Sequence, residues 1–290
     1  MVRKPISCLV ILFSLLLPSH FINAEVNNEQ KAELSEKEVQ GQLIWADLYS
    51  ADIKTSIDFY TNTFNWTVKK LGEPSSSYHI FYQNGLAVAG LLDRSAKREK
   101  TSQALWVGSI YTKNVAQVVN ESENKGATII LKPHEFDRFG NRAVMADPLG
   151  GIIALLDLKN ANKERRKKAE NHWGWAQLFS VDTKAASTFY AEAFDYQIEN
   201  IEGRKHAYYL SKDEDVYASV IKMPEKFPQR DRWVNFFELV DVEKHLAKAI
   251  ENGSKVIYSS PEQQLAIIAD PSGAFIGLTE LPATLALETK

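Results

Sequence analysis

Two tryptophan residues recur in the same short sequence context and are well suited to hold a small molecule. Trp45 opens the run Trp-Ala-Asp-Leu-Tyr-Ser, and Trp175 opens the run Trp-Ala-Gln-Leu-Phe-Ser. Both runs are predicted strands, whose side chains alternate between two faces, so each tryptophan shares a face with the polar residue two places later. An indole ring beside a polar group can stack on a flat compound and orient it. The candidate ligand-binding residues are therefore Trp45, Asp47, Trp175 and Gln177.

Asp47 requires a partner if its strand face points inward, because a buried carboxylate needs a ligand cation or a neighbouring arginine. Arg142, which follows the turn Phe139-Gly-Asn141, is the candidate partner and a fifth candidate binding residue. The pair could take part in ligand binding, or it could be a structural ion pair at a strand end. The sequence leaves both interpretations open.

Glu238 is a candidate for acid–base catalysis. It lies in the apolar strand Val234-Asn-Phe-Phe-Glu-Leu-Val240. A carboxylate surrounded by apolar side chains is suited to act as a general base. The alternative is that Glu238 faces solvent at the end of the strand. The sequence therefore does not decide whether the protein is an enzyme.

The first 24 residues have the order of a secretory signal peptide. Met1-Val-Arg-Lys4 is basic, the run from Ile6 to Leu17 is almost entirely apolar, and Ile22-Asn-Ala24 offers a small residue at a cleavage site. The apolar run is too short to span a bilayer, and no later segment is long enough either. We predict an exported protein, periplasmic or extracellular, with no integral membrane segment after cleavage; the alternative is an uncleaved N-terminal anchor.

The composition excludes several classes of protein. Of 290 residues, 44% are hydrophobic and 24% are charged, which excludes a disordered chain, a collagen-like fibre and a coiled coil. The net charge of -3 gives no general attraction to phosphate, so nucleic acid is not an expected partner. The single cysteine, Cys8, lies in the predicted signal peptide, so the mature chain would hold no disulfide and no thiolate nucleophile.

The chain contains an internal sequence repeat. Phe59-Tyr60 and Phe189-Tyr190 occupy matching places, as do Asp147-Pro-Leu-Gly150 and Asp270-Pro-Ser-Gly273. We predict two homologous domains within a chain divided as follows: signal peptide 1–24, polar leader 25–41, domain 1 at 42–158, basic linker 159–170, domain 2 at 171–283 and tail 284–290.

Each domain is predicted to contain two βαβββ modules, which places the protein in the α+β class. Asp52 and Asp182 stand where a helix N-cap belongs, directly before apolar residues at helical spacing. Asn84-Gly85 between two apolar runs predicts a hairpin turn. Tyr60 and Tyr190 are expected to be packing residues.

The order of these motifs resembles the vicinal oxygen chelate superfamily, which includes glyoxalase, bleomycin-resistance proteins and extradiol dioxygenases. The resemblance extends over essentially the whole predicted mature chain, with one copy of the motifs in each domain. The chain is most similar to tandem glyoxalase-like proteins. It implies that the paired βαβββ modules curl their sheets around a cup. In the metal enzymes of this family the cup holds a divalent ion on about three His, Glu or Gln side chains.

The residues at the ligand positions implied by this resemblance are not metal donors. They are Trp45, Gly90, Val107 and Ala154 in domain 1, and Trp175, Ser219, Val234 and Gly277 in domain 2. Aromatic, small and apolar side chains do not coordinate a divalent cation. We therefore predict that the family's metal site is lost and that no cofactor is bound.

Three functional hypotheses remain. The first is a metal-free cup that binds a small planar or apolar molecule, in the manner implied by the bleomycin-resistance relatives. The second is a lyase, isomerase or dioxygenase-type enzyme with a relocated metal site. The third is a scaffold for protein interaction, in which Trp45 and Trp175 fill the cups. A monomer or a homodimer is expected.

Overall fold

The computed structural model describes residues 40–72, 78–94, 103–136, 140–158, 172–212 and 215–280. The predicted signal peptide, the linker, the tail and nearly all of the leader lie outside these residues. Within the described ranges, no helix is long and apolar enough to cross a membrane.

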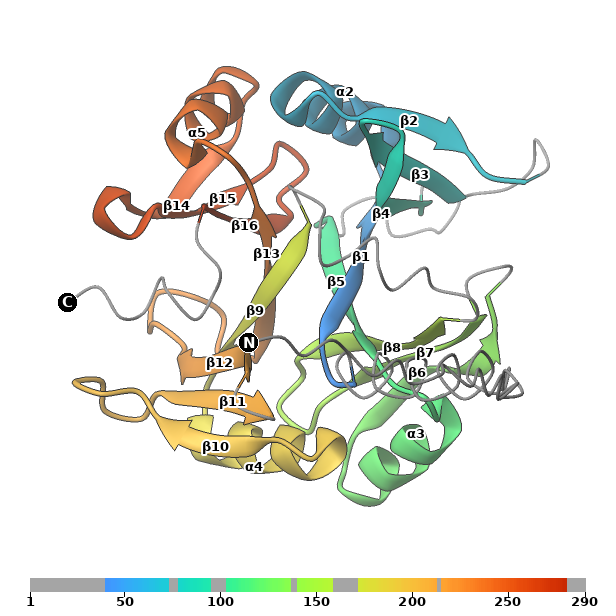
Figure 1. Ribbon diagram of the computed structural model, residues 1–290, viewed down its shortest axis with the longest axis vertical. Coiled ribbons are helices and arrows are strands. Elements are labelled where there is room, and N and C mark those ends of the chain that lie inside the picture. The colour runs from blue at the N-terminus through green and yellow to red at the C-terminus, as the bar shows by residue number, and fades with distance from the viewer. Residues whose placement is uncertain are drawn as a thin grey trace, which may run out of the picture. The chain divides into compact units, whose positions relative to one another are not determined.

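The first half of the described chain forms an eight-stranded mixed sheet in the order β2-β3-β4-β1-β5-β8-β7-β6 (Figure 1). Along the chain its elements are β1 (Leu43–Ser50), α2 (Ile53–Phe64), β2 (Thr67–Lys70), β3 (Tyr78–Gln83), β4 (Leu86–Asp93), β5 (Leu105–Tyr111), α3 (Val115–Asn124), β6 (Thr128–Glu135), β7 (Gly140–Ala146) and β8 (Ile152–Leu158). This is the predicted βαβββ module, twice.

The second half repeats this sheet in the order β10-β11-β12-β9-β13-β16-β15-β14. Its elements are β9 (Trp173–Ser180), α4 (Thr183–Phe194), β10 (Gln197–Asn200), β11 (Tyr208–Lys212), β12 (Asp215–Lys222), β13 (Arg232–Glu238), α5 (Val242–Glu251), β14 (Lys255–Ser260), a 3-10 turn (Pro261–Gln263), β15 (Leu265–Ala269) and β16 (Phe275–Thr279). The predicted α+β fold with two tandem copies is confirmed.

The first helix of each copy begins at the predicted aspartate. An Oδ1 atom of Asp52 accepts the backbone N–H of Thr55 at 3.0 Å, and Oδ1 of Asp182 accepts that of Ala185 at 3.0 Å. Each side chain satisfies one of the N–H groups that have no partner within the first helical turn. The cap fixes where the strand before it ends, and so fixes the position of Trp45 and Trp175 along their strands.

The two copies share one core on their helical faces. Helix α2 packs against α5, α3 packs against α4, and the central strands β1 and β9 also meet. Trp106 lies 5.1 Å from Trp173 between ring centroids, and Trp66 lies 5.1 Å from Phe237. Because these buried rings come from both copies, the two halves are held together by apolar packing, which leaves the opposite sheet faces for the cups.

Tyr60 has a second role in this shared core. Its hydroxyl is fully buried, donates to Asp270 Oδ2 of the other copy at 2.9 Å, and accepts from the indole N–H of Trp106 at 2.7 Å. The predicted packing role of Tyr60 is confirmed, and the residue also bonds the two copies together.

Tyr190 repeats this arrangement in the reverse direction. Its hydroxyl donates to Asp147 Oδ2 of the first copy at 2.8 Å and accepts from the Trp233 indole N–H at 2.8 Å. The aspartate of each Asp-Pro-x-Gly turn is therefore bonded by a tyrosine from the other copy. We call these two groups the tyrosine clamps: Trp106–Tyr60–Asp270 and Trp233–Tyr190–Asp147.

Asp231 makes the stability of this interface depend on pH. The residue is 3% exposed, its Oδ1 accepts the N–H of Val181 at 2.9 Å, and its own N–H donates to the Leu149 carbonyl of the other copy at 3.1 Å. Burial, reinforced by the nearby Asp147 carboxylate, raises the pKa of Asp231 to about 6. The folded protein therefore favours the protonated form, so this contribution to stability is complete below pH ~4 and is lost as the pH rises through about 6.

The Asp231→Asn variant is expected to be more stable than the wild type at pH 8, by on the order of 2 kcal/mol, and similar to it at pH 4. The asparagine keeps an acceptor for the Val181 N–H but cannot ionise. Urea unfolding at pH 4, 6 and 8 measures the difference, with Asp215→Asn at an exposed position as the control. A stability difference that does not change with pH would contradict the prediction.

Candidate functional site

Three of the predicted site residues meet in the cup of the first copy, which we call the first cup. Arg142 Nη2 lies 2.6 Å from Asp47 Oδ2, and the two side chains are 5% and 1% exposed. Asp47 Oδ1 accepts the indole N–H of Trp45 at 3.1 Å and the hydroxyl of Tyr78 at 2.6 Å. Arg142 also donates to the Tyr49 hydroxyl at 3.1 Å. The predicted pairing of Asp47 with Arg142 is confirmed, and their charges are satisfied within the protein.

The walls of the first cup leave these groups little space. Strand β4 runs beside β1 with Gly90 opposite Asp47, and a Cβ atom on Gly90 would lie 1.9 Å from Asp47 Oδ1. The Arg142 guanidinium stacks over the Phe136 ring with 4.9 Å to its centroid. Burial, together with the Asp47 charge, raises the pKa of Tyr78 well above its usual range, so the phenol stays a proton donor. In the first cup a buried polar network therefore occupies the space around Asp47 and Arg142.

The second cup has the same framework without the charges. Trp175 and Gln177 on β9 stand where Trp45 and Asp47 stand on β1. Leu265 takes the place of Arg142, since each lies five residues before the aspartate of its Asp-Pro-x-Gly turn. With a leucine and a glutamine in these places, the second cup has no counterpart of the buried ion pair.

A cavity of about 240 Å³ lies in the second cup. Its walls are mainly aromatic and aliphatic, and include Trp175, Gln177, Phe179, Val234, Leu265 and Phe275. The Trp175 side chain is 1% exposed, and its ring packs 5.1 Å from that of Phe236. Trp175 and Gln177 therefore line a cavity as the sequence suggested, whereas Trp45 and Asp47 belong to the buried polar network of the first cup.

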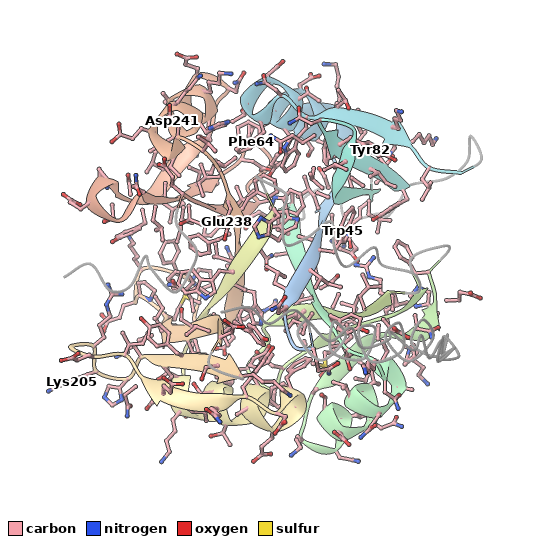
Figure 2. The ribbon with its side chains drawn as sticks, in the orientation of Figure 1. Trp45, Phe64, Tyr82, Lys205, Glu238 and Asp241 are labelled. Carbon is pink, nitrogen blue, oxygen red and sulfur yellow. The ribbon has the colours of Figure 1, made fainter. Side chains whose placement is uncertain are left out.

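Glu238 lies apart from this cavity. It ends strand β13, its side chain is 21% exposed, and its Oε2 lies 3.4 Å from His172 Nδ1 (Figure 2 labels Glu238 and Trp45). A Cβ atom on Gly174 would lie 2.1 Å from Glu238 Oε1, so the carboxylate is packed against backbone. Glu238 is not among the residues that line the cavity. A catalytic role for Glu238 stays a prediction, because the cavity described above does not include this residue.

The positions that would hold a divalent ion do not fit one. Val107 and Ala154 pack together as apolar wall, and a Cβ atom on Gly277 would lie 2.3 Å from the Phe236 ring. A side chain at Gly90 would likewise collide with Asp47. Over the ranges that the structure describes, no three His, Cys, Asp or Glu side chains are grouped to hold a metal ion.

Sequence reasoning missed several residues of the two cups. Tyr49 and Tyr78 complete the first network, and Phe275 and Arg232 line the second cavity. For Arg232 a signal existed, since it lies two residues before Val234 on the same strand and so shares its face. For Tyr78 none existed, because its contact with Asp47 depends on the pairing of strands that are far apart in sequence.

Comparison with known proteins agrees with this architecture. Residues 42–154 match the family model described as the Glyoxalase/Bleomycin resistance protein/Dioxygenase superfamily. The anthracycline biosynthesis protein DauV of Streptomyces sp. (strain C5) is 26% identical over 259 residues, which cover 83% of this chain and 94% of that protein.

Two solved structures share the fold at low sequence identity. The 2,3-dioxygenase LapB from Pseudomonas sp. KL28 aligns with a TM-score of 0.55 and 14% identity, over 83% of this chain and 92% of that one. The Mn(II)-bound glyoxalase from Novosphingobium aromaticivorans aligns with a TM-score of 0.57 and 12% identity, over 84% and 83% of the two chains. Residues 42–154 therefore match the glyoxalase, bleomycin resistance protein and dioxygenase superfamily, and the described chain carries the corresponding fold twice.

Proposed function

We propose that the protein binds a small, flat and largely apolar molecule in its second cup, without a metal ion. The observation that carries this proposal is the cavity beside Trp175. Its aromatic walls favour a planar ligand, which gains both burial and ring stacking. At about 240 Å³ the cavity is smaller than the roughly 300–1,000 Å³ of sites for drug-sized ligands, which favours a compound of one or two rings.

Three further observations support this function. The relative DauV is named as an anthracycline biosynthesis protein, so a relative of the same fold is associated with the handling of a small molecule. The residues at the family's metal positions are poor donors, which supports a metal-free cup. The N-terminal sequence supports export, so we propose that binding takes place outside the cytoplasm.

The binding proposal is tested by closing the second cup with the side chains of the first. The double variant Gln177→Asp, Leu265→Arg places an ion pair where the cavity lies. We expect its affinity for a neutral two-ring probe, 2-naphthamide, to fall at least about tenfold, because the probe would have to displace a buried pair. Isothermal titration calorimetry and tryptophan fluorescence measure the binding.

The matched control is Asp47→Gln, Arg142→Leu, which makes the opposite exchange in the first cup. This variant leaves the second cup intact, so its affinity for 2-naphthamide at that cup should equal that of the wild type, and a site opened in the first cup would add to the number of bound probes. Equal binding by the closed variant, or lost binding in the control, would place the ligand outside the second cup. Elemental analysis of protein purified without chelator tests the metal-free state, and one equivalent of a transition metal per chain would refute it.

A further inference from the structure

The charged side chains that line the cavity of the second cup are all basic among the described residues. Three basic side chains line the cavity, those of Arg204, Lys226 and Arg232. Among the described residues of the lining there is neither an aspartate nor a glutamate. A lining with only positive charge attracts anions and disfavours cations, and in a partly closed apolar site this preference is stronger than in water.

Arg232 is the most enclosed of these cations and has no acidic partner in the part of the chain that the structure describes. Its guanidinium lies over the Phe275 ring, 4.7 Å from the centroid, and is half-buried. Burial, together with the nearby Arg230, lowers the pKa of Arg232. A guanidinium held on an aromatic ring presents its N–H groups in a fixed plane, which suits two parallel hydrogen bonds to a carboxylate.

The indole of Trp175 also lacks a partner. Its N–H is buried, and no acceptor is found for it among the described residues. In the first cup the matching indole, Trp45, donates to the carboxylate of Asp47. In the second cup that aspartate is replaced by Gln177. The second cup therefore keeps the donor of this hydrogen bond and has lost its carboxylate acceptor.

We propose that the ligand of the second cup is an aromatic carboxylic acid, bound as its anion. The ligand carboxylate pairs with the Arg232 guanidinium, while its ring packs against the apolar walls of the cavity. Gln177 can donate to the second carboxylate oxygen. This inference rests on the proposed binding function and adds the chemical class of the ligand.

The test compares two probes of nearly equal shape, 2-naphthoate and the neutral 2-naphthamide, by calorimetry on the mature protein at pH 7. We expect the naphthoate to bind at least about tenfold more tightly. In Arg232→Leu, which carries the residue found at the matching position of the first cup, Leu105, this preference should fall below about threefold, while the amide binds as before. Gln177→Asp should likewise weaken the naphthoate selectively, since the new carboxylate satisfies the Trp175 indole and repels the anion.

A control separates a specific pair from general attraction. Lys205→Gln removes an exposed cation that does not line the cavity and should leave the preference unchanged. Equal binding of both probes by the wild type, or an unchanged preference in Arg232→Leu, would overturn the carboxylate assignment and leave the binding function intact. Failure of both probes to bind would overturn the binding function as well.

Discussion

Replacing Arg142 by leucine is expected to lower the free energy of unfolding by about 3–5 kcal/mol, because it leaves the Asp47 carboxylate buried without its counter-charge. Asp47 is 1% exposed, and its Oδ2 atom is buried beside the Arg142 guanidinium. For a chain of this length each kcal/mol corresponds to roughly 2–4 °C in the melting temperature, so the expected decrease is roughly 6–20 °C. Urea unfolding and thermal denaturation followed by circular dichroism measure it.

The double variant Asp47→Gln, Arg142→Leu should recover more than half of this loss. It gives the first cup the residues that the second cup already carries at the same places, and a pair removed together leaves no uncompensated ion. The exposed Arg204, replaced by leucine, serves as the control and should change stability by less than about 0.5 kcal/mol. A double variant as unstable as Arg142→Leu would show that the polar network is required for packing and not only for charge balance.

Much of the fold could be predicted because its signals are local. The aspartate caps before α2 and α4 follow from residues within one helical turn. The turn at Asn84-Gly85 has positive φ at both residues, 49° and 77°, as its sequence predicts for a tight hairpin. The repeat then confirms each local signal by showing it twice. The partnership of Asp47 and Arg142 was also predictable, from strand alternation and the need to neutralise a buried carboxylate.

The open state of the second cup could not be predicted in the same way. Aligning the two copies pairs Arg142 with Leu265, but a leucine can fill a space as well as an arginine can. Whether a cavity remains depends on how Phe179, Phe275 and their neighbours pack, and these contacts join strands that are distant in sequence. The strand face that Arg232 shares with Val234 could be read from the sequence, but the absence of an acid among its described neighbours could not.

The tyrosine clamps could not be predicted from the sequence for a different reason. Tyr60 and Tyr190 are recognisable as core residues, but their partners Asp270 and Asp147 appear in the sequence only as turn residues. Each aspartate accepts backbone N–H groups of its own turn, such as that of Ala274 at 2.9 Å, which is sufficient reason for an aspartate there. The bond between the copies uses the second carboxylate oxygen, and nothing local in the sequence indicates it.

Removing both clamp hydroxyls, in the double variant Tyr60→Phe, Tyr190→Phe, is expected to lower the free energy of unfolding by about 4–6 kcal/mol, with about 2–3 kcal/mol from each site. Each substitution leaves a buried carboxylate oxygen and an indole N–H without their hydroxyl partner. The two clamps share no residue, so their effects should add. Urea unfolding of the two single variants and the double variant measures this, with Tyr258→Phe at an exposed position as the control.

The pH dependence of these variants separates the clamp from simple packing. Burial raises the pKa of Asp270 and of Asp147, and the tyrosine hydroxyl in each case opposes that rise. Without the hydroxyl each pKa rises further, so the ionised carboxylate becomes more costly and the loss of stability should be greater at pH 8 than at pH 5. A loss that is equal at both values would mean that the hydroxyls matter only for filling space. Each clamp joins a helix of one copy to a turn of the other. A greater loss at pH 8 would therefore show that the packing of the two copies against each other depends on two hydrogen bonds to ionised carboxylates.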